Sequence, residues 1–184
     1  PDFIINCLGV TKFHKNYNQL KVTKLLNTNF PIFLSKLCIK KKFFFIHIST
    51  DCVFSGKKGN YKDNDITDAV DTYGKTKSLG EVNSGYALTI RSSMIGFELF
   101  NKTELLEWAF KNQKKSINGF SNIIYSGITT QLMAKIVVKI IKDFTDLSGI
   151  YNISSVPISK YYLLKKINEI FDLNIEIKSV ESKP

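Results

Sequence analysis

The stretch "IHISTDCVF", residues 46–54, is followed after one polar loop by "YGKTK", residues 73–77. The first stretch is an apolar run that ends in a serine–threonine pair, as expected of a buried strand that opens into a site. If the second stretch is helical, Tyr73 and Lys77 share a face about one turn apart. A phenol has a pKa of about 10, and a neighbouring ammonium group favours the phenolate and lowers that pKa. This spacing suits a tyrosine that exchanges protons near neutral pH, although an exposed helix with scattered lysines would share it.

Strands and helices alternate on both sides of this pair, which indicates an α/β protein with a parallel sheet. Strands are predicted over residues 3–9, 43–48, 87–91, 149–154 and, as a short last strand, 174–180. Helices are predicted over 17–41, from Thr72 onward, over 103–112, over 130–144, and from about Ser159 to Phe171. Pro31 should kink or restart the first helix. Residues 55–70 should form a loop, and residues 118–130 an irregular segment with one short extended piece.

Bulk properties describe an ordinary globular protein of 184 residues, 43% hydrophobic and 23% charged. No apolar run reaches the length of a membrane span. The three cysteines lack metal-ligand spacing and indicate reduced thiols in a cytoplasmic protein without a metal site. The net charge of +10 comes from lysines spread along the chain, which favours a solvated surface over a nucleic-acid interface. An apolar strand that begins almost at Pro1 predicts that an N-terminal portion of the protein is missing.

Three motifs in one order carry a family resemblance: "STD" at 49–51, "YGKTK" at 73–77 and "IRSSMIG" at 90–96. Together they resemble the extended short-chain dehydrogenase/reductase superfamily. The longer pattern "HISTDCVFSGKKGNY…D…YGKTKSLGE" is similar to the dTDP-4-dehydrorhamnose reductase family, over nearly the whole chain. The resemblance implies the C-terminal half of a Rossmann-type parallel sheet with a small appended substrate-binding lobe. Residues 1–97 would form a partial NAD(P)-binding domain with the catalytic residues. Residues 98–184 would be mainly the lobe, with helix 130–144 and strand 149–154 packing back on the first domain.

The resemblance also implies a reaction, the NAD(P)H-dependent reduction of a nucleotide-diphospho-4-keto-6-deoxysugar in deoxysugar or surface-polysaccharide synthesis. Thr50 would bind the substrate oxygen, Tyr73 would transfer its proton, and Lys77 would lower the pKa of Tyr73 and hold the nicotinamide ribose. NADPH or NADH would supply the hydride. Besides Tyr73 and Lys77, the implied cofactor contacts are Cys7, Leu8, Gly9, Ser49, Ser93, Met94 and Ile95. The implied substrate contacts are Asp51, Val53, Phe54, Ser126 and Gly127.

Five further polar residues stand out, and three of them have two interpretations each. Asn27 matches a family asparagine that holds the catalytic helix region through water, or is a helix-surface residue. Arg91 could bind ligand or pair with a carboxylate, and Asp51 could orient the substrate or cap a loop. His47, between Ile46 and Ile48, is expected to be a packed structural histidine. Asp63 stands where many relatives carry a glutamate.

Two departures keep other functions open. The glycine-rich dinucleotide fingerprint is absent, and with it the residue that selects NAD or NADP. Asp51 is followed by Cys52, so only half of the acid/base pair of the related dehydratases is present. The alternatives are a nucleotide-sugar epimerase or dehydratase, and a non-catalytic subunit resembling the regulatory subunit of methionine adenosyltransferase. No nucleic acid or membrane partner is expected, and a homodimer is left open.

Overall fold

The computed structural model describes residues 1–12 and 17–182. The chain divides into two compact units, each assembled from two separate segments. The first unit contains residues 1–93 and 133–153, and the second contains residues 94–132 and 154–184. A segment from the second half of the sequence therefore completes the unit that holds both the serine–threonine pair and the Tyr–Lys pair.

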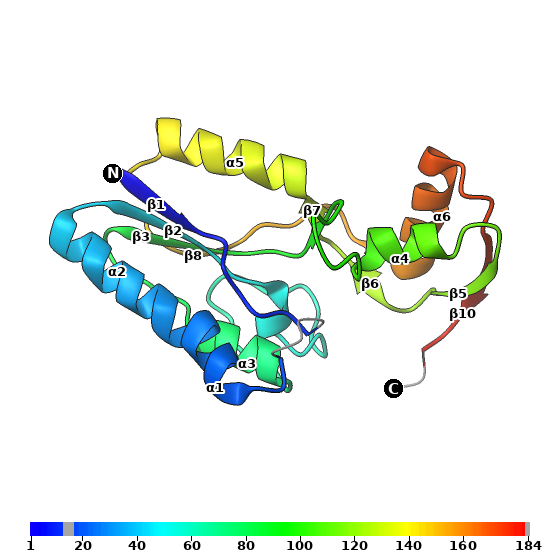
Figure 1. Ribbon diagram of the computed structural model, residues 1–184, viewed down its shortest axis with the longest axis horizontal. Coiled ribbons are helices and arrows are strands. Elements are labelled where there is room, and N and C mark those ends of the chain that lie inside the picture. Colours follow the sequence, from blue (N-terminus) through cyan, green and yellow to red (C-terminus); the bar gives the residue numbers. More distant parts are fainter. Residues whose placement is uncertain (13–16, 183–184) are drawn as a thin grey trace. The chain divides into compact units, whose positions relative to one another are not determined.

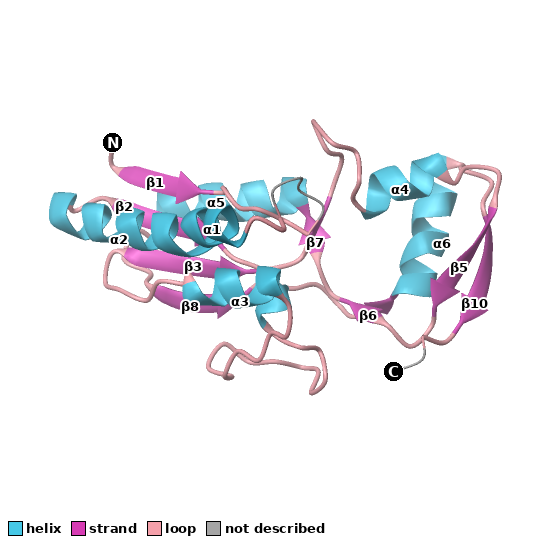
Figure 2. Cartoon of the chain, turned by 60° about the horizontal axis from the view of Figure 1, so that its bottom comes forward, coloured by secondary structure: helices cyan, strands magenta, loops and turns pink. Residues whose placement is uncertain are grey.

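The first unit is built on a four-stranded parallel sheet (Figures 1 and 2). Its strands, in spatial order, are β1 (Phe3–Asn6), β2 (Phe44–Ile48), β3 (Ala87–Arg91) and β8 (Gly149–Asn152). Every residue of β2 and β3 is buried, as expected for central strands with both faces covered. The predicted fold class, a Rossmann-type parallel α/β sheet, is confirmed.

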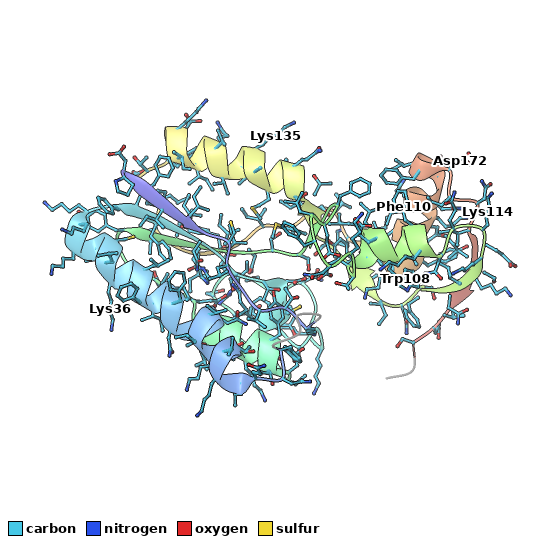
Figure 3. All side chains as sticks on the ribbon, viewed as in Figure 1. Lys36, Trp108, Phe110, Lys114, Lys135 and Asp172 are labelled. Atoms are coloured by element: carbon cyan, nitrogen blue, oxygen red, sulfur yellow. The ribbon has the colours of Figure 1, made fainter. Side chains whose placement is uncertain are left out.

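Helices cover the two faces of this sheet (Figure 1). One face carries α1 (Leu20–Lys24), η1 (Leu25–Asn29), α2 (Phe30–Lys41) and α3 (Thr72–Leu79). The other face carries α5 (Thr130–Asp143), which buries Met133, Val137 and Ile140. Lys36 on α2 and Lys135 on α5 point away from the sheet (Figure 3), as expected for a solvated lysine-rich surface.

Two predicted elements of this unit differ from the structure. The first strand ends at Asn6 rather than at residue 9, because the Asn6 side chain accepts a hydrogen bond from the Leu8 backbone N–H (3.2 Å) and turns the chain. The predicted helix 17–41 begins at Leu20 and contains a π-helical turn, η1. Pro31 follows that turn and has no N–H to donate to the Asn27 carbonyl four residues earlier, so the helix widens there instead of ending.

The second unit is a small α/β body with short strands. Its elements are β4 (Met94–Ile95), α4 (Leu105–Lys111), β5 (Ser116–Phe120), β6 (Ile124–Tyr125), β7 (Ile128–Thr129), β9 (Ile158–Ser159), α6 (Lys160–Phe171) and β10 (Glu176–Val180). Buried Leu106, Ile117, Leu164 and Leu173 belong to its core. The Ser159 side chain accepts a hydrogen bond from the Tyr162 N–H and caps α6.

Residues 118–130 were expected to be irregular with one extended piece, and this prediction is wrong. They contribute to three short strands, each paired with a partner distant in sequence: β5 with β10, β6 with β9, and β7 with β4. The two-residue strands β6 and β7 have no periodicity to read, so only their partners define them.

Among the residues that the structure describes, no helix is both long enough and apolar enough to cross a membrane.

Candidate functional site

Parallel strands bring three chain segments to one edge of the sheet. The segments that follow β1, β2 and β3 all leave from its carboxyl edge, where ligands bind in open α/β folds. Cys7, Leu8 and Gly9 follow β1, Ser49 to Asp51 follow β2, and Ser92 and Ser93 follow β3. The first unit therefore gathers most of the predicted site residues at one edge.

Thr50 organises the turn that follows β2. It has extended backbone dihedrals, and its hydroxyl accepts a hydrogen bond from the Cys52 N–H (3.1 Å) at the start of η2 (Asp51–Val53). The same hydroxyl donates to the Asp51 carboxylate at 3.3 Å. Thr50, and not Asp51, is therefore the residue that caps η2. The Asp51 side chain is exposed. Thr50 itself is buried, with a fixed hydroxyl.

Helix α3 places Tyr73 and Lys77 beside this turn. Asp71 caps the helix by accepting from the Gly74 N–H at 2.7 Å, and its carboxylate also pairs with Lys12 at 2.6 Å. Tyr73 is half-buried, one helical turn before Lys77. The Lys77 ammonium group donates to the Ile48 carbonyl at 2.7 Å, at the end of β2.

Lys77 is the one buried lysine among the residues that the structure describes, with 3% of its surface exposed. Burial lowers the pKa of Lys77 from 10.5 to about 8, against the opposing effects of Glu81 and Cys7. Burying an ammonium group is costly even when it is hydrogen-bonded to a carbonyl, so the structure distinguishes Lys77 sharply from the surface lysines.

Two glycines let α3 approach its neighbours. A Cβ atom at Gly74 would overlap the Cys52 carbonyl oxygen and would lie 2.7 Å from the Ala69 Cβ. A Cβ atom at Gly80 would overlap the carbonyl oxygen of Asn27, the one that Pro31 leaves without its helical donor. The glycines of "YGKTKSLG" are therefore packing requirements that hold Tyr73 and Lys77 against the strand ends.

Asn27 lies in η1 and is fully buried, so the interpretation as a helix-surface residue is wrong. Its amide accepts from the Val10 N–H (2.8 Å) and donates to the Val10 carbonyl (3.1 Å). It also donates to the Thr76 hydroxyl (3.1 Å), and so contacts α3 directly. Asn27 thereby ties the segment after β1 to the helix that carries Lys77.

The segment after β1 comes close to the Lys77 ammonium group at Gly9. A Cβ atom there would lie 3.4 Å from the Asn27 side-chain oxygen and 3.8 Å from the Lys77 Nζ atom. Cys7 is exposed as a residue, but partial burial of its thiol raises the pKa of that thiol, and the charge of Lys77 opposes the rise. Leu8 is also exposed. Gly9 therefore keeps the space beside Lys77 open.

Several of the polar residues considered above make contacts within the chain. The Ser49 hydroxyl donates to Glu81 at 2.8 Å. Arg91 pairs with Glu81 at 2.7 Å, which settles its two interpretations in favour of the carboxylate. The Asp63 carboxylate accepts from the Asn152 N–H at 2.6 Å. Sequence reasoning did not single out Glu81, which lies four residues after Lys77 in the same motif.

Two expectations concern side chains that pack in the interior. His47 is fully buried, as predicted, and its ring contacts Asn6 at 3.1 Å. Burial and the charge of Lys77 lower the pKa of His47 to about 3. Val53 was implied as a substrate contact, but its side chain has 0% exposure, so that implication is corrected: Val53 packs in the core. Phe54 keeps partial exposure.

The remaining predicted residues lie in the second unit. Met94 and Ile95 form β4 and pair with Ile128 and Thr129 of β7. The Ser126 carbonyl accepts from the Ser155 N–H at 2.6 Å, and the Gly127 carbonyl accepts from the Ser155 hydroxyl at 2.9 Å.

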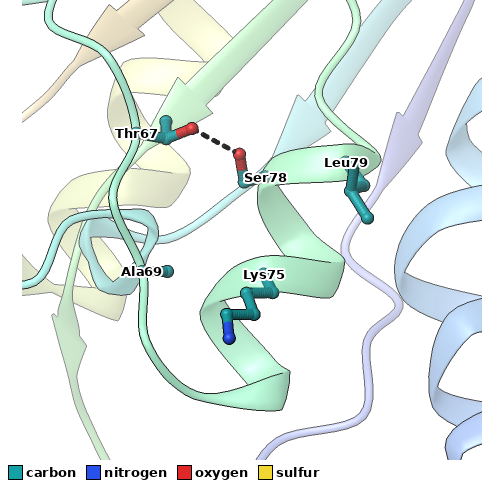
Figure 4. A pocket seen from close by; sticks show the side chains of 5 residues that line it. All are labelled: Thr67, Ala69, Lys75, Ser78 and Leu79. Atoms are coloured by element: carbon teal, nitrogen blue, oxygen red, sulfur yellow. Dashed lines mark hydrogen bonds between the residues drawn. The ribbon is translucent and has the colours of Figure 1, made fainter.

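A small pocket on α3 is separate from this set of residues. Thr67, Ala69, Lys75, Ser78 and Leu79 line it, and Thr67 and Ser78 share a hydrogen bond of 2.7 Å (Figure 4). Lys75 and Leu79 lie on the side of the helix opposite Tyr73 and Lys77, by the helical period. Within the described part of the chain, no group of three histidine, cysteine or carboxylate side chains is placed to hold a metal ion.

Comparison with known proteins shows the family of the chain. Residues 1–174 match the RmlD substrate binding domain. The chain belongs to the RmlD substrate-binding domain family. A dTDP-4-dehydrorhamnose reductase of Aggregatibacter actinomycetemcomitans is 27% identical over 193 residues, covering 100% of this chain and 65% of that protein.

Solved RmlD-family structures agree with the fold. A hypothetical dTDP-4-dehydrorhamnose reductase from Sulfolobus tokodaii is 29% identical with a TM-score of 0.83, covering 100% of this chain and 66% of that one. The dTDP-4-dehydrorhamnose reductase of Bacillus anthracis, solved in complex with NADP, has a TM-score of 0.84 at 21% identity, covering 99% of this chain and 66% of that one. The chain thus spans about two thirds of the length of these relatives.

Proposed function

We propose that the protein carrying this chain reduces a nucleotide-diphospho-4-keto-6-deoxysugar with a nicotinamide cofactor. One observation supports this most: the Lys77 ammonium group binds the Ile48 carbonyl, two residues before Thr50, while Tyr73 lies one turn before Lys77. A hydroxyl donor, a phenol and a buried cation are thus held at the carboxyl edge of a Rossmann-type sheet. Membership of the RmlD family supports the same reaction.

The three side chains divide the work at the substrate's carbonyl oxygen. Thr50 donates a hydrogen bond to this oxygen, in place of its present hydrogen bond to the exposed Asp51 carboxylate, which is long at 3.3 Å. Tyr73 delivers the proton that converts this oxygen into a hydroxyl, as a general acid. Lys77 lies one turn further along the same helix, where its positive charge favours the phenolate that Tyr73 becomes.

The residues present fit a nicotinamide cofactor. Gly9 places no side chain beside the Lys77 ammonium group: a Cβ atom there would lie 3.4 Å from the Asn27 side-chain oxygen and 3.8 Å from the Lys77 Nζ atom. Lys77 would hold the ribose hydroxyls, and Cys7, Leu8 and Ser93 of the same unit are proposed as further contacts. The cofactor supplies the hydride. We propose NADPH first, because the Bacillus anthracis relative was solved with NADP, and NADH second.

Two pairs of residues are proposed as contacts of the sugar nucleotide. Asp51 directly follows Thr50, Phe54 follows η2, and both have exposed surface for the sugar. Ser126 and Gly127 would face the nucleotide, through backbone groups or the Ser126 hydroxyl, because both of their carbonyls already accept from Ser155.

The test is turnover by the full-length gene product with dTDP- and UDP-linked 4-keto-6-deoxysugars and with the parent hexoses. Net oxidation of NADPH or NADH with a keto-sugar, giving the alcohol, supports the proposal. Interconversion of epimers without net cofactor consumption would assign an epimerase, and a keto-sugar formed from a hexose would assign a dehydratase. Cofactor binding without turnover of any of these substrates would favour a non-catalytic subunit.

A further inference from the structure

A buried ion pair, Glu81–Arg91, lies beside the reactive residues, and the roles proposed above make no use of it. The Arg91 Nε and Nη2 atoms donate to the two Glu81 carboxylate oxygens at 2.8 and 2.7 Å, a bidentate arrangement. The two side chains are 5% and 4% exposed. Such a pair holds its partners in one geometry, which is more specific than a single lysine–carboxylate contact.

Glu81 connects the pair to the reactive groups. One of its oxygens also accepts from the Ser49 hydroxyl at 2.8 Å, and Ser49 directly precedes Thr50. Glu81 itself follows α3 closely, with its N–H bonded to the Ser78 carbonyl at 3.2 Å. The carboxylate thus joins the turn that presents Thr50 to the end of the helix that presents Lys77.

Arg91 connects the pair to the substrate side. As the last residue of β3 it leads into Ser92 and Ser93. Its Nη1 atom donates to the Asp63 carbonyl at 3.1 Å, and its guanidinium carbon lies 5.0 Å from the centre of the Phe54 ring.

The loop that Arg91 holds is ordered further by its own contacts. The rings of Phe54 and Tyr61 stack with centres 4.2 Å apart. The Asp63 carboxylate binds the Asn152 N–H on β8 at 2.6 Å, and the Asn152 side chain donates to the Tyr61 carbonyl at 3.4 Å. Arg91 therefore links β3 and this loop, which begins at the proposed sugar contacts.

We infer that Glu81 and Arg91 act as a positioning pair, which holds the Thr50 turn and the loop 54–65 in register with the helix that carries Tyr73 and Lys77. The inference rests on the proposed function. A buried ion pair is a poor source of net stability, since well-packed apolar residues often replace it without loss. A purely structural role would therefore be met equally well by apolar side chains, whereas a positioning role would not.

The decisive variant is Glu81→Leu/Arg91→Met, which removes both charges and leaves neither unpaired. We expect it to fold, with a melting temperature close to that of the parent, and its kcat to fall about tenfold to a hundredfold through misplacement of Thr50. The alkaline limb of its kcat profile should move to lower pH, because Lys77 loses the carboxylate that favours its charged form. The other groups around that ammonium, Cys7 and neutral His47, are unchanged.

A second variant, Arg91→Lys, keeps the charge but loses the fork and the flat face over Phe54. We expect the alkaline limb to stay in place, the KM for the sugar nucleotide to rise severalfold, and amide exchange in residues 54–65 to accelerate. The matched control is Lys139→Met/Asp143→Leu, which removes an exposed ion pair on α5 and should change none of these quantities.

Parental kcat and an unshifted alkaline limb in a folded double variant would overturn the inference. So would parental KM and parental exchange in Arg91→Lys, even if the double variant does not fold. If the unmodified protein turns over no keto-sugar, the proposed function fails instead, and the exchange of residues 54–65 in Arg91→Lys still decides whether the pair holds the loop.

Discussion

Lys77 carries a charge where the fold would be more stable without one. Its ammonium group is buried against the Ile48 carbonyl, and burial lowers its pKa from 10.5 to about 8. Between those two pH values the unfolded chain binds more protons at this residue than the folded chain, so the free energy of unfolding rises with pH across that window. Stability is lost to this residue at neutral pH, as is common where a group is kept for chemistry.

Lys77→Met should therefore stabilise the chain while it abolishes turnover. The shift from 10.5 to about 8 corresponds to at most about 3 kcal/mol, and the lost hydrogen bond offsets about 1 kcal/mol of that gain. Urea unfolding at pH 7 should show a net gain of roughly 1–2 kcal/mol. A clear loss of stability in Lys77→Met would show that Lys77 is a structural cation.

Buried His47 should make the stability of the chain sensitive to acid, because its pKa is lower in the folded chain than in the unfolded chain. Its pKa is about 3 when folded, against 6.5 as the ordinary value, so the folded chain resists protonation. The stability that neutral His47 provides is complete above about pH 6.5 and is lost as the pH falls toward 3.

The measurement is the difference in unfolding free energy between the parent and His47→Gln as a function of pH. It should be constant above pH 6.5 and shrink by up to about 1.4 kcal/mol per pH unit below it. Carboxylates such as Asp71 titrate in both proteins and cancel in the difference. A difference that stays constant down to pH 4 would mean that His47 reaches solvent.

At the scale of elements, α3 is held by close contacts at its glycines. Gly74 meets the Cys52 carbonyl and Ala69, and Gly80 meets the Asn27 carbonyl. The two contacts fix α3 against η2 and η1, and so set the distance between Lys77 and the Thr50 turn. A wider contact would move the reactive groups apart without touching any of them.

Gly74→Ala should destabilise the chain by about 1–3 kcal/mol, as expected for overpacking, and should lower kcat as well. Gly85→Ala is the matched control, because no atom of the described residues, apart from its chain neighbours, lies within 4 Å of a Cβ at that position. Thermal melts and turnover of the two variants decide the matter. Equal behaviour of the two would show that α3 can shift without consequence.

Elements with strong periodicity could be predicted from the sequence, and elements defined by distant partners could not. The strand 87–91 was recognisable as a short, mostly apolar run, and the helix from Thr130 because its apolar residues repeat with the helical period. The π-helical turn, and the strands β6 and β7, depend on packing and pairing with remote segments.

The same distinction holds for the candidate site. Thr50, Tyr73 and Lys77 are visible as motifs in the sequence, and Asn27 was suspected from the family pattern. Glu81 had a signal too, since it follows Lys77 by one helical turn, but its partner Arg91 could be found only once the strands were placed side by side. Val53 was misjudged because a motif shows which residues are near a site but not which way each side chain points.

At the scale of the whole molecule, the edge strand β1 is exposed. Within the described part of the chain it pairs with β2 alone. Phe3 and Ile5 on this strand are each 41% exposed. An apolar strand with unpaired backbone groups is a template for pairing with another chain.

The 184-residue chain is therefore expected to self-associate as its concentration rises in sedimentation experiments. Phe3→Lys/Ile5→Lys should suppress this association, because charged side chains at an edge oppose strand pairing. Leu20→Lys, at an exposed position on α1, adds charge elsewhere and should not. Equal suppression by both variants would assign the effect to net charge rather than to the edge.

The central claim is that Tyr73 transfers the proton at the substrate carbonyl, and its most direct test is the kcat of Tyr73→Phe in the full-length gene product. The variant keeps the ring and loses only the hydroxyl, so NADPH binding should be unchanged while kcat falls about 10²–10⁴-fold. Tyr86→Phe, at an exposed tyrosine, is the matched control and should keep the parental kcat. A Tyr73→Phe enzyme whose kcat equals that of Tyr86→Phe would contradict the account.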